Sequence, residues 1–393
     1  MSPATASGGA LPPLALYVHY PWCVRKCPYC DFNSHTRREG EDKATLEARY
    51  IDALIADLAS ARATAGGRRI SSIFFGGGTP SLMSAAGLTR LLTAIGEQLT
   101  LDDTTEITLE ANPGTFEAER FRAYREAGIN RLSIGIQSFN AHHLQRIGRI
   151  HDGDEARRAV AIAQECFERI NLDLMYALPE QRLEEALADI NTALASGVEH
   201  LSCYHLTLEP NTLFHRQPPS LPDDDLAADM QEAIEARLSA AGFDHYETAA
   251  FARAQQQCRH NLNYWQFGDY LGIGAGAHAK VSTADGRVLR EMRHKHPQRY
   301  LDAAANGDFV QDRRVVSARE LPFEFMMNAL RLNHGVPSAL FEARTGLTLD
   351  VIAAPLEQAR AAGLMHTDPQ RLQTTPLGRR FLNDVLTPFL PSA

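Results

Sequence analysis

Long apolar runs and an excess of positive charge are both missing from this sequence of 393 residues. No stretch approaches the roughly 20 apolar residues that a membrane-spanning helix needs, and the opening residues lack the basic start and apolar run of a secretory signal. We therefore expect a cytoplasmic protein that is not an integral membrane protein. Lys and Arg number 39 against 48 Asp and Glu, for a net charge of −9 at pH 7. Since nucleic acid binding requires a basic face, we expect no nucleic acid partner.

Cysteine is also scarce, because six in the chain do not suggest a disulfide framework. Three of them, Cys23, Cys27 and Cys30, lie within eight residues of one another. In a reducing compartment such a group indicates bound metal. Cys166 lies in a helical pattern and Cys203 in a strand pattern, and both are typical of small buried residues.

The N-terminal half alternates short apolar runs with longer stretches in which Leu, Ile and Ala recur every three or four residues. The pattern predicts six strands, at residues 14–19, 70–77, 106–111, 131–136, 171–177 and 200–206. Strands separated by helices form successive β/α units around a parallel sheet. Six units rather than eight predict an α/β fold with a partial, open β/α barrel, whose open side would suit a large or protein-borne substrate.

The remainder of the chain has a different pattern. A Pro-rich connection at 211–222 precedes a predicted helix, a Gly-rich loop follows at 268–278, and the sequence becomes mostly helical from about 313. We expect four parts: a flexible N-terminus at 1–13, the barrel at 14–222, a segment at 223–312 that completes the barrel and connects it onward, and a smaller, mostly helical domain at 313–393, with a winged helix as one form.

The three clustered cysteines directly follow the first predicted strand, with C-x3-C-x2-C spacing. Three thiolates can hold a [4Fe–4S] cubane and leave one iron exchangeable. Structural zinc is the alternative, with Asp31 or His35 as a fourth ligand. The spacing, with Tyr29 before the last cysteine, resembles that of the radical S-adenosylmethionine (SAM) superfamily. The second predicted strand ends in GGGTPS, residues 76–81, and the corresponding turn of that superfamily contacts SAM.

Polar residues also end the later strands: Glu110 and Asn112 the third and Gln137 the fourth. Each could simply cap the next helix. Together with Arg149 and Asp173 they resemble, in order and spacing, the barrel of oxygen-independent coproporphyrinogen III oxidase and its relatives. The resemblance implies a [4Fe–4S] cluster on Cys23, Cys27 and Cys30, and SAM contacts from Tyr17, Tyr29, Gly77, Gly78, Thr79, Glu110, Gln137, Arg149 and Asp173.

Two features differ from those oxidases. Phe32 stands where they carry a further cysteine, and the segment before the first strand is short. The segment HNLNYW, residues 260–265, resembles the HNxxYW pattern of the related haem chaperones of the HemW type. This resemblance implies haem binding by His260, Tyr264 and Trp265, since a neutral imidazole can ligate haem iron and aromatic rings can pack on the macrocycle. Alternatively, His260 caps a turn and the aromatic rings fill the seam between barrel and C-terminal domain.

The resemblance therefore implies a haem chaperone that binds haem as cargo and delivers it to haem-accepting proteins, with membrane respiratory enzymes as candidate acceptors and a homodimer as a candidate assembly. One alternative is the oxidase itself, in which a SAM-derived radical starts the decarboxylation of propionate side chains. Another is a different radical reaction, such as methyl transfer. Whether the protein is an enzyme stays open at this stage.

Overall fold

Six parallel strands form the centre of the sheet, as the sequence predicts. The computed structural model describes residues 11–37, 40, 42–115 and 118–391, so nearly all of the predicted flexible N-terminus lies outside the described residues. The strands lie side by side in chain order: β1 (Leu14–Tyr20), β4 (Ile70–Gly77), β5 (Glu106–Ala111), β6 (Arg131–Gln137), β7 (Arg169–Tyr176) and β8 (His200–His205).

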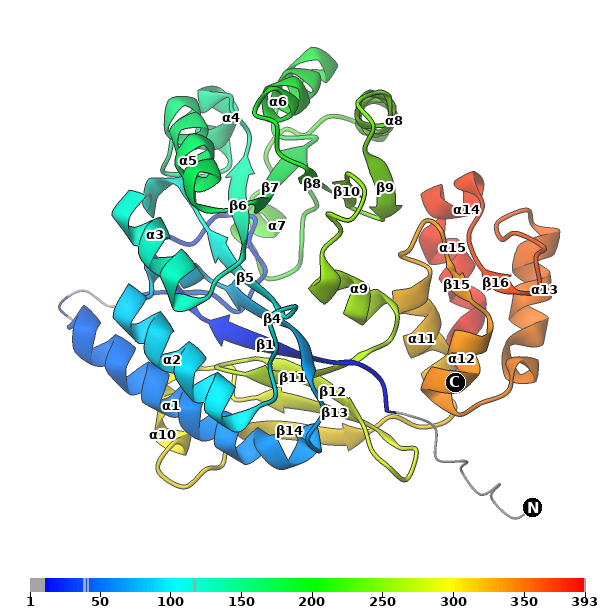
Figure 1. Cartoon of the computed structure of the whole chain (residues 1–393). Coiled ribbons are helices and arrows are strands. Elements are labelled where there is room, and N and C mark those ends of the chain that lie inside the picture. Colours follow the sequence, from blue (N-terminus) through cyan, green and yellow to red (C-terminus); the bar gives the residue numbers. More distant parts are fainter. Residues whose placement is uncertain (1–10, 38–39, 41, 116–117, 392–393) are drawn as a thin grey trace.

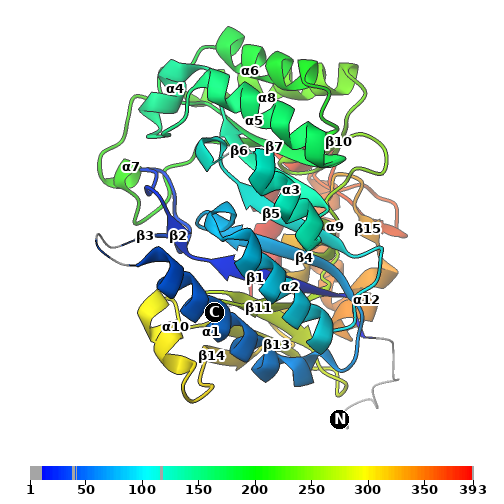
Figure 2. The ribbon, with the colours of Figure 1, turned by 60° about the vertical axis from the view of Figure 1, so that its left-hand side comes forward.

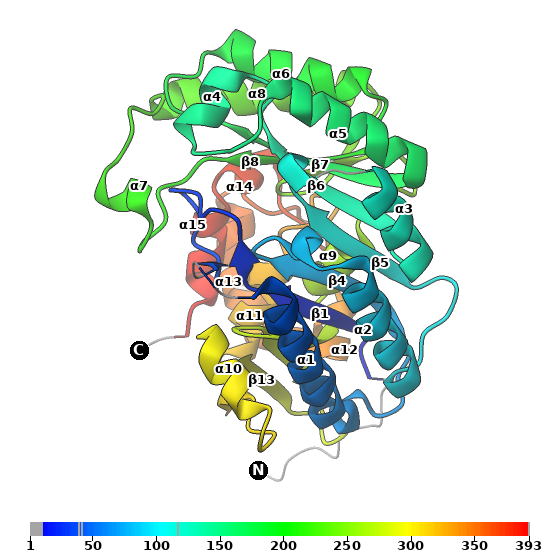
Figure 3. The ribbon, with the colours of Figure 1, turned by 90° about the vertical axis from the view of Figure 1, so that its left-hand side faces the viewer.

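Helices cover the outer side of the curved sheet, which faces the viewer in Figure 3. They are α1 (Lys43–Ala65), α2 (Ala85–Gln98), α3 (Ala118–Ala127), α4 (Ala141–Arg146), α5 (Gly153–Cys166), α6 (Leu183–Ala195) and α8 (Asp224–Ala240). Local sequence signals set their ends. The Asp42 carboxylate accepts the first N–H groups of α1, and Gly66 ends that helix at φ 59°.

The sheet contains six more strands than the sequence analysis predicted, 12 within the described residues. Two lie beyond β8: β10 (Ala250–Ala252) and β9 (Asp244–Glu247). Four lie beyond β1: β11 (Asp269–Ile273), β12 (His278–Ser282), β13 (Val288–Arg293) and β14 (Val310–Val315). The two ends, β9 and β14, are not paired with each other, so the barrel is open. The predicted Gly-rich loop at 268–278 is mostly strand, because only its middle residues form the turn between β11 and β12.

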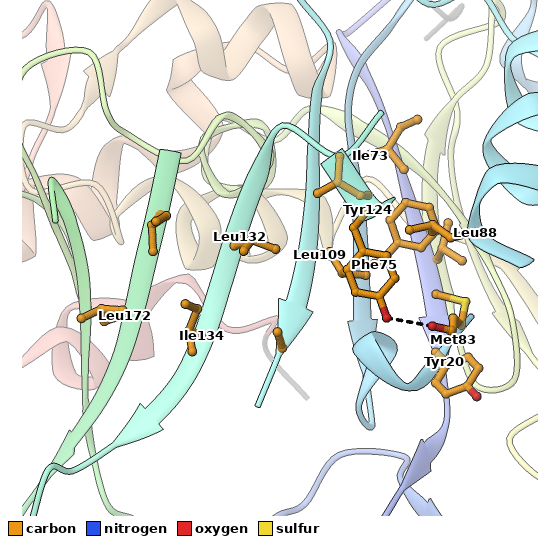
Figure 4. Packing of buried hydrophobic residues seen from close by; sticks show 14 of the residues in the cluster. Tyr20, Ile73, Phe75, Met83, Leu88, Leu109, Tyr124, Leu132, Ile134 and Leu172 are labelled. Atoms are coloured by element: carbon orange, nitrogen blue, oxygen red, sulfur yellow. Dashed lines mark hydrogen bonds between the residues drawn. The ribbon is translucent and has the colours of Figure 1, made fainter. Parts of the chain in front are cut away.

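The main hydrophobic core lies between the sheet and the outer helices. Figure 4 shows Phe75, Leu88 and Leu109 packed together beside Tyr124, whose hydroxyl donates a hydrogen bond to the Met83 carbonyl at 2.8 Å. Side chains of a strand alternate between its faces. One face of each central strand therefore fills this core, and the other face lines the concave interior of the barrel.

A second core holds the C-terminal helices together, around residues such as Phe325 and Phe341. The elements here are α11 (Leu321–Ala329), α12 (Ala339–Thr345), α13 (Ala353–Ala361), α14 (Pro376–Arg380), α15 (Leu382–Leu386) and the antiparallel pair β15 (Val336–Pro337) and β16 (Arg371–Leu372). Figure 1 shows the short helix α9 (Arg259–Trp265) between the sheet and these helices, and Leu262 and Trp265 pack against their core. Helix α9 therefore joins the barrel to the C-terminal helices.

The remaining elements are short: β2 (Trp22–Cys23), β3 (His35–Thr36), α7 (Leu213–Arg216) and α10 (Pro297–Ala303). Strands β2 and β3 pair in parallel and flank the cysteine segment, which Figure 2 shows beside α7. Among the residues that the structure describes, no helix has the length and apolar character required to cross a membrane.

Candidate functional site

The three clustered cysteines line one cavity of about 350 Å³ at the carboxyl end of the central strands. All three thiols are free and partly buried. Burial raises the pKa of the Cys23 and Cys30 thiols above the ordinary value. The Arg149 guanidinium lies 3.7 Å from the Cys27 sulfur.

This donor set fits an iron–sulfur cubane better than zinc. Among the described residues, no three His, Cys, Asp or Glu side chains converge on a point where they could hold one metal ion. A zinc ion needs four ligands around one centre, whereas each cysteine of a cubane binds a different iron. His35, a candidate fourth zinc ligand, is instead hydrogen-bonded to the Asn33 side chain at 3.1 Å. The cavity therefore suits a cluster held by Cys23, Cys27 and Cys30.

Eight of the nine predicted SAM contacts line the same cavity. They are Tyr29, Gly77, Gly78, Thr79, Glu110, Gln137, Arg149 and Asp173. They come from the cysteine segment, from the ends of four neighbouring strands and from the segment before α5, so the parallel order of the sheet brings them together. The sequence analysis did not select Tyr204 and His205, which also line the cavity. Both lie at the end of β8, a predicted strand whose position is the signal that could have identified them.

Close packing requires the glycines at the end of β4. Gly77 has φ 116°, and a Cβ atom there would lie 2.6 Å from the His19 ring. A Cβ atom on Gly78 would lie 2.6 Å from the Trp22 carbonyl oxygen. The N–H groups of both glycines donate within the chain, to the Glu110 carboxyl at 3.2 Å and to a β1 carbonyl at 2.7 Å. The N–H groups of both glycines are therefore committed within the chain.

Two half-buried carboxyl groups, those of Glu110 and Asp173, line the cavity. Burial, and then the nearby Asp173, raise the pKa of Glu110 from 4.5 to about 8. Burial also raises the pKa of Asp173, although Ser133 and Asn171 donate hydrogen bonds to it at 2.9 and 2.8 Å. Glu110 therefore holds a proton at neutral pH. Gly77 donates its N–H to Oε2 of this carboxyl group at 3.2 Å.

Backbone strain marks the neighbouring strand end. Gln137 has φ 66°, which few residues other than glycine adopt, and the register between β6 and β7 shifts beside it. Arg149 reaches the same point and donates to the Gly135 carbonyl oxygen. Beside this register shift, Gln137 is one of the residues that line the cavity.

The comparisons with known proteins agree with this geometry. A model of the radical SAM superfamily matches residues 17–193, and a model of the HemN C-terminal domain matches residues 316–381. The chain is 49% identical to the protein named "Heme chaperone HemW" from Escherichia coli strain K12, over 97% of this chain and 99% of that protein. The chain belongs to the radical SAM haem chaperone family.

Other similarities extend across species and to a solved structure. A Bacillus subtilis protein also named "Heme chaperone HemW" is 34% identical over 95% of this chain and 98% of its own. The Mus musculus protein named "Radical S-adenosyl methionine domain-containing protein 1, mitochondrial" is 36% identical over 99% and 89%. The coproporphyrinogen III oxidase HemN of Escherichia coli superposes with a TM-score of 0.81 at 23% identity, over 96% and 90% of the two chains, which shows a shared fold.

Tyr17, the ninth predicted SAM contact, is not among the residues that line the cavity. Its hydroxyl donates to Nδ1 of His19 at 2.9 Å, and Nε2 of His19 donates to the Asn33 carbonyl oxygen at 2.9 Å. Burial lowers the pKa of His19 to about 4, so this ring is neutral at pH 7. Through His19, Tyr17 is therefore linked by hydrogen bonds to Asn33 at the end of the cysteine segment.

Asn33 fastens the cysteine segment to the turn between β11 and β12, a role that the sequence analysis did not assign. Its side-chain amide donates to the carbonyl oxygens of Ala275 and Lys295, both at 2.9 Å. A Cβ atom on Gly276 would lie 2.3 Å from the same amide, so glycine makes the close approach feasible. The cysteine positions therefore depend on a strand pair that follows them by more than 200 residues in the chain.

The HNxxYW segment of this family member forms helix α9 and lies apart from the cysteine cavity. His260 is buried, stacks on Phe74 at 5.0 Å between ring centroids, and is hydrogen-bonded to Ser72 at 2.9 Å and to Tyr264 at 3.0 Å. Burial lowers its pKa to about 3. Both ring nitrogens are thus engaged within the protein, and the role of His260, Tyr264 and Trp265 in haem binding stays a prediction.

The buried Glu106 of β5 anchors the start of α9. Its carboxylate accepts the His260 backbone N–H at 3.2 Å, and Arg169 donates to its other oxygen at 2.7 Å. These partners hold the pKa of Glu106 below its ordinary value against the effect of burial. A carboxylate at a helix N-terminus stabilises the helix dipole. The contacts of α9 therefore favour the alternative in which its aromatic rings fill the seam between barrel and C-terminal helices.

Proposed function

We propose that this chain is a haem chaperone that binds haem and delivers it to haem-accepting proteins, with membrane respiratory enzymes as the first acceptors to test. The observation that carries the proposal is the 49% identity to the Escherichia coli heme chaperone over nearly the full length of both chains. Phe32 supports it, because this side chain is 62% exposed at the rim of the cavity, where the oxidases are expected to carry a cysteine.

In this proposal Cys23, Cys27 and Cys30 hold a [4Fe–4S] cluster, and the cavity beside them receives SAM. Such a cluster supplies an exchangeable iron and, when reduced, an electron. Because the N–H groups of the Gly77 turn are committed within the chain, the turn meets a ligand through carbonyl oxygens, which suit the ammonium group of SAM. Arg149 contacts the Cys27 sulfur, and cluster and SAM serve assembly, dimerisation or a transfer step.

The test is an anaerobic haem titration, followed by absorbance, of cluster-reconstituted wild-type protein and His260→Ala. His142→Ala, at an exposed position on α4, is the matched control. Saturable stoichiometric binding in wild type and control supports the chaperone, and absent or non-saturable binding in both contradicts it. Weaker binding in His260→Ala assigns haem ligation to His260. Equal binding in all three proteins assigns His260 to the packing of α9.

A second candidate function is the oxidative decarboxylation catalysed by coproporphyrinogen III oxidase. The shared fold favours it, with a TM-score of 0.81 to HemN, but at 23% identity this match concerns the fold alone. Anaerobic conversion of coproporphyrinogen to protoporphyrinogen by the reconstituted protein would establish it. SAM cleavage without that product would indicate a different radical reaction, such as methyl transfer.

The proposal also includes a cytoplasmic location and a homodimer. Cell fractionation tests the first, and light scattering of the eluted protein with and without haem tests the second. A dimer that forms only in the reconstituted protein would link assembly to the cluster.

A further inference from the structure

A second recess lies between α9, strands β11 to β13 and helix α11, where the barrel meets the C-terminal helices (Figure 1). It encloses about 200 Å³. Its lining residues are Tyr264, Trp265, Phe267, Gly268, Tyr270, Lys280, Arg290 and Asn328. None of them lines the cysteine cavity, so the recess is a separate site. The lining combines four aromatic rings with two cations and contains no carboxylate.

Lys280 supplies one buried positive charge. Its side chain is only 1% exposed, and the ammonium donates to the Phe267 carbonyl oxygen at 2.9 Å and lies 3.1 Å from the Asp269 carboxylate. Arg68 binds the same carboxylate at 2.6 Å. Two cations therefore share the single negative charge of Asp269, and one positive charge remains in excess at this end of the recess.

Arg290 supplies the second cation. It donates to the Glu324 carboxylate and, at 2.6 Å, to the Tyr270 hydroxyl oxygen. These contacts with the described residues use three of its five N–H groups. Arg314 binds Glu324 as well, at 3.0 Å, so this carboxylate is also shared between two guanidinium groups. The recess thus keeps uncommitted N–H donors beside its aromatic walls.

Trp265 adds a neutral donor. Its Nε1–H is buried and has no hydrogen-bond partner among the described residues. A buried donor without an acceptor costs about 1–3 kcal/mol, so such groups are rare in folded proteins. Arg331 stacks over the indole ring at 4.4 Å and fixes its plane. A ligand oxygen that reaches this N–H would remove the cost of leaving it unpaired.

We propose that this recess binds a carboxylate carried on a small apolar group. The carboxylate accepts from Trp265 and from the free N–H groups of Arg290, and the apolar group packs against the ring of Tyr264 or Phe267. A short-chain monocarboxylate has this chemistry and fits the enclosed volume. The aromatic walls disfavour inorganic phosphate, which has no apolar part to bury. The recess is separate from the cysteine cavity, and because Tyr264 and Trp265 also belong to the segment predicted to bind haem, the test uses haem-free protein.

Butyrate is the probe, with butanol, phosphate and chloride as comparisons. The chain has only two Trp residues, so ¹⁵N-labelled indole groups give two N–H resonances. Trp22→Phe assigns the Trp265 resonance. We expect butyrate to shift it saturably and butanol to leave it unchanged. Trp265→Phe keeps an aromatic ring but loses the donor, and calorimetry should show butyrate affinity at least tenfold weaker there. Arg290→Gln should weaken binding similarly.

Three outcomes would overturn the proposal. They are no saturable shift with butyrate, the same shift with butanol or chloride, and unchanged butyrate affinity in Trp265→Phe. Phosphate binding as tight as butyrate would also overturn it, because the aromatic walls would then contribute nothing. If Arg290→Gln fails to fold, Trp265→Phe alone decides, since it leaves every ion pair of the recess in place. None of these results depends on whether the chain binds haem.

Discussion

The proton on Glu110 gives the cavity a measurable stability signature. Burial and the neighbouring Asp173 raise the Glu110 pKa from 4.5 to about 8, so the folded chain binds this proton more tightly than the unfolded chain. The resulting stabilisation is fully present below pH 4.5 and is lost as the pH rises through 8. A rise of this size corresponds to at most about 5 kcal/mol, and water in the open cavity reduces it to about 2–4 kcal/mol.

Glu110→Gln tests this reasoning, because glutamine has the shape of the protonated acid and cannot ionise. We expect wild type and variant to have similar free energies of unfolding at pH 5. At pH 8.5 the variant should be more stable by about 2–4 kcal/mol. Urea denaturation of the cluster-free protein, at pH steps between these limits, measures the difference. Glu126→Gln, at an exposed position of α3, is the matched control and should show no such divergence.

The reasoning would be refuted by a difference between wild type and Glu110→Gln that does not change with pH, or by a variant that becomes relatively less stable as the pH rises. Asp173→Asn gives an independent check. Removing the nearby carboxylate should lower the pKa of Glu110 and reduce the divergence between pH 5 and 8.5.

Three further changes test the packing around the site. Gly77→Ala should destabilise the protein by about 1–3 kcal/mol, because Gly77 has a positive φ and the added Cβ atom would press on the His19 ring. Gly96→Ala is the control on the open surface of α2 and should stabilise the protein by about 0.5–1 kcal/mol. Urea denaturation measures both free energies of unfolding. Asn33→Ala loses two hydrogen bonds worth about 0.5–1.5 kcal/mol each, so reconstituted protein should release iron faster on dialysis, and an unchanged rate would contradict its anchoring role. Phe325→Ala should cost about 3–5 kcal/mol and expose the C-terminal core to proteolysis, while cleavage confined to the barrel would contradict this.

The sequence predicted the six central strands because each is a short run with apolar residues on at least one face, set between longer helical stretches, and all six lie within two residues of the expected positions. It did not predict β11 and β12. These strands are short, the turn between them is rich in Gly and Ala, and they meet where a Cβ atom on Gly272 would lie 2.0 Å from the His278 carbonyl oxygen. A Gly-rich segment indicates a turn, but the close approach that makes it a strand pair depends on residues distant in sequence.

Sequence could also predict some residues of the candidate site and not others. The carboxyl ends of parallel strands meet at one edge, so Glu110, Gln137 and Asp173 could be assigned to one cavity from their places in or directly after predicted strands. Tyr17 lies in the middle of β1, and its ring packs against Phe74 and close to Gly76 of β4 rather than in the cavity wall. Sequence spacing gives the edge on which a residue lies and not its depth.

Strand β4 contacts helix α9 through some of its residues and lines the cysteine cavity at its carboxyl end. Ser72 bonds His260, Phe74 stacks between the rings of His260 and Tyr17, and Gly77 ends on the cavity wall. All three residues belong to one strand, which β1 and β5 hold by hydrogen bonds on both sides. A strand paired on both edges cannot slide without breaking both ladders. Ligands bound at α9 and at the cavity would therefore contact two ends of one rigid element, and any coupling between them would have to pass through side chains such as Phe74 rather than through movement of the sheet.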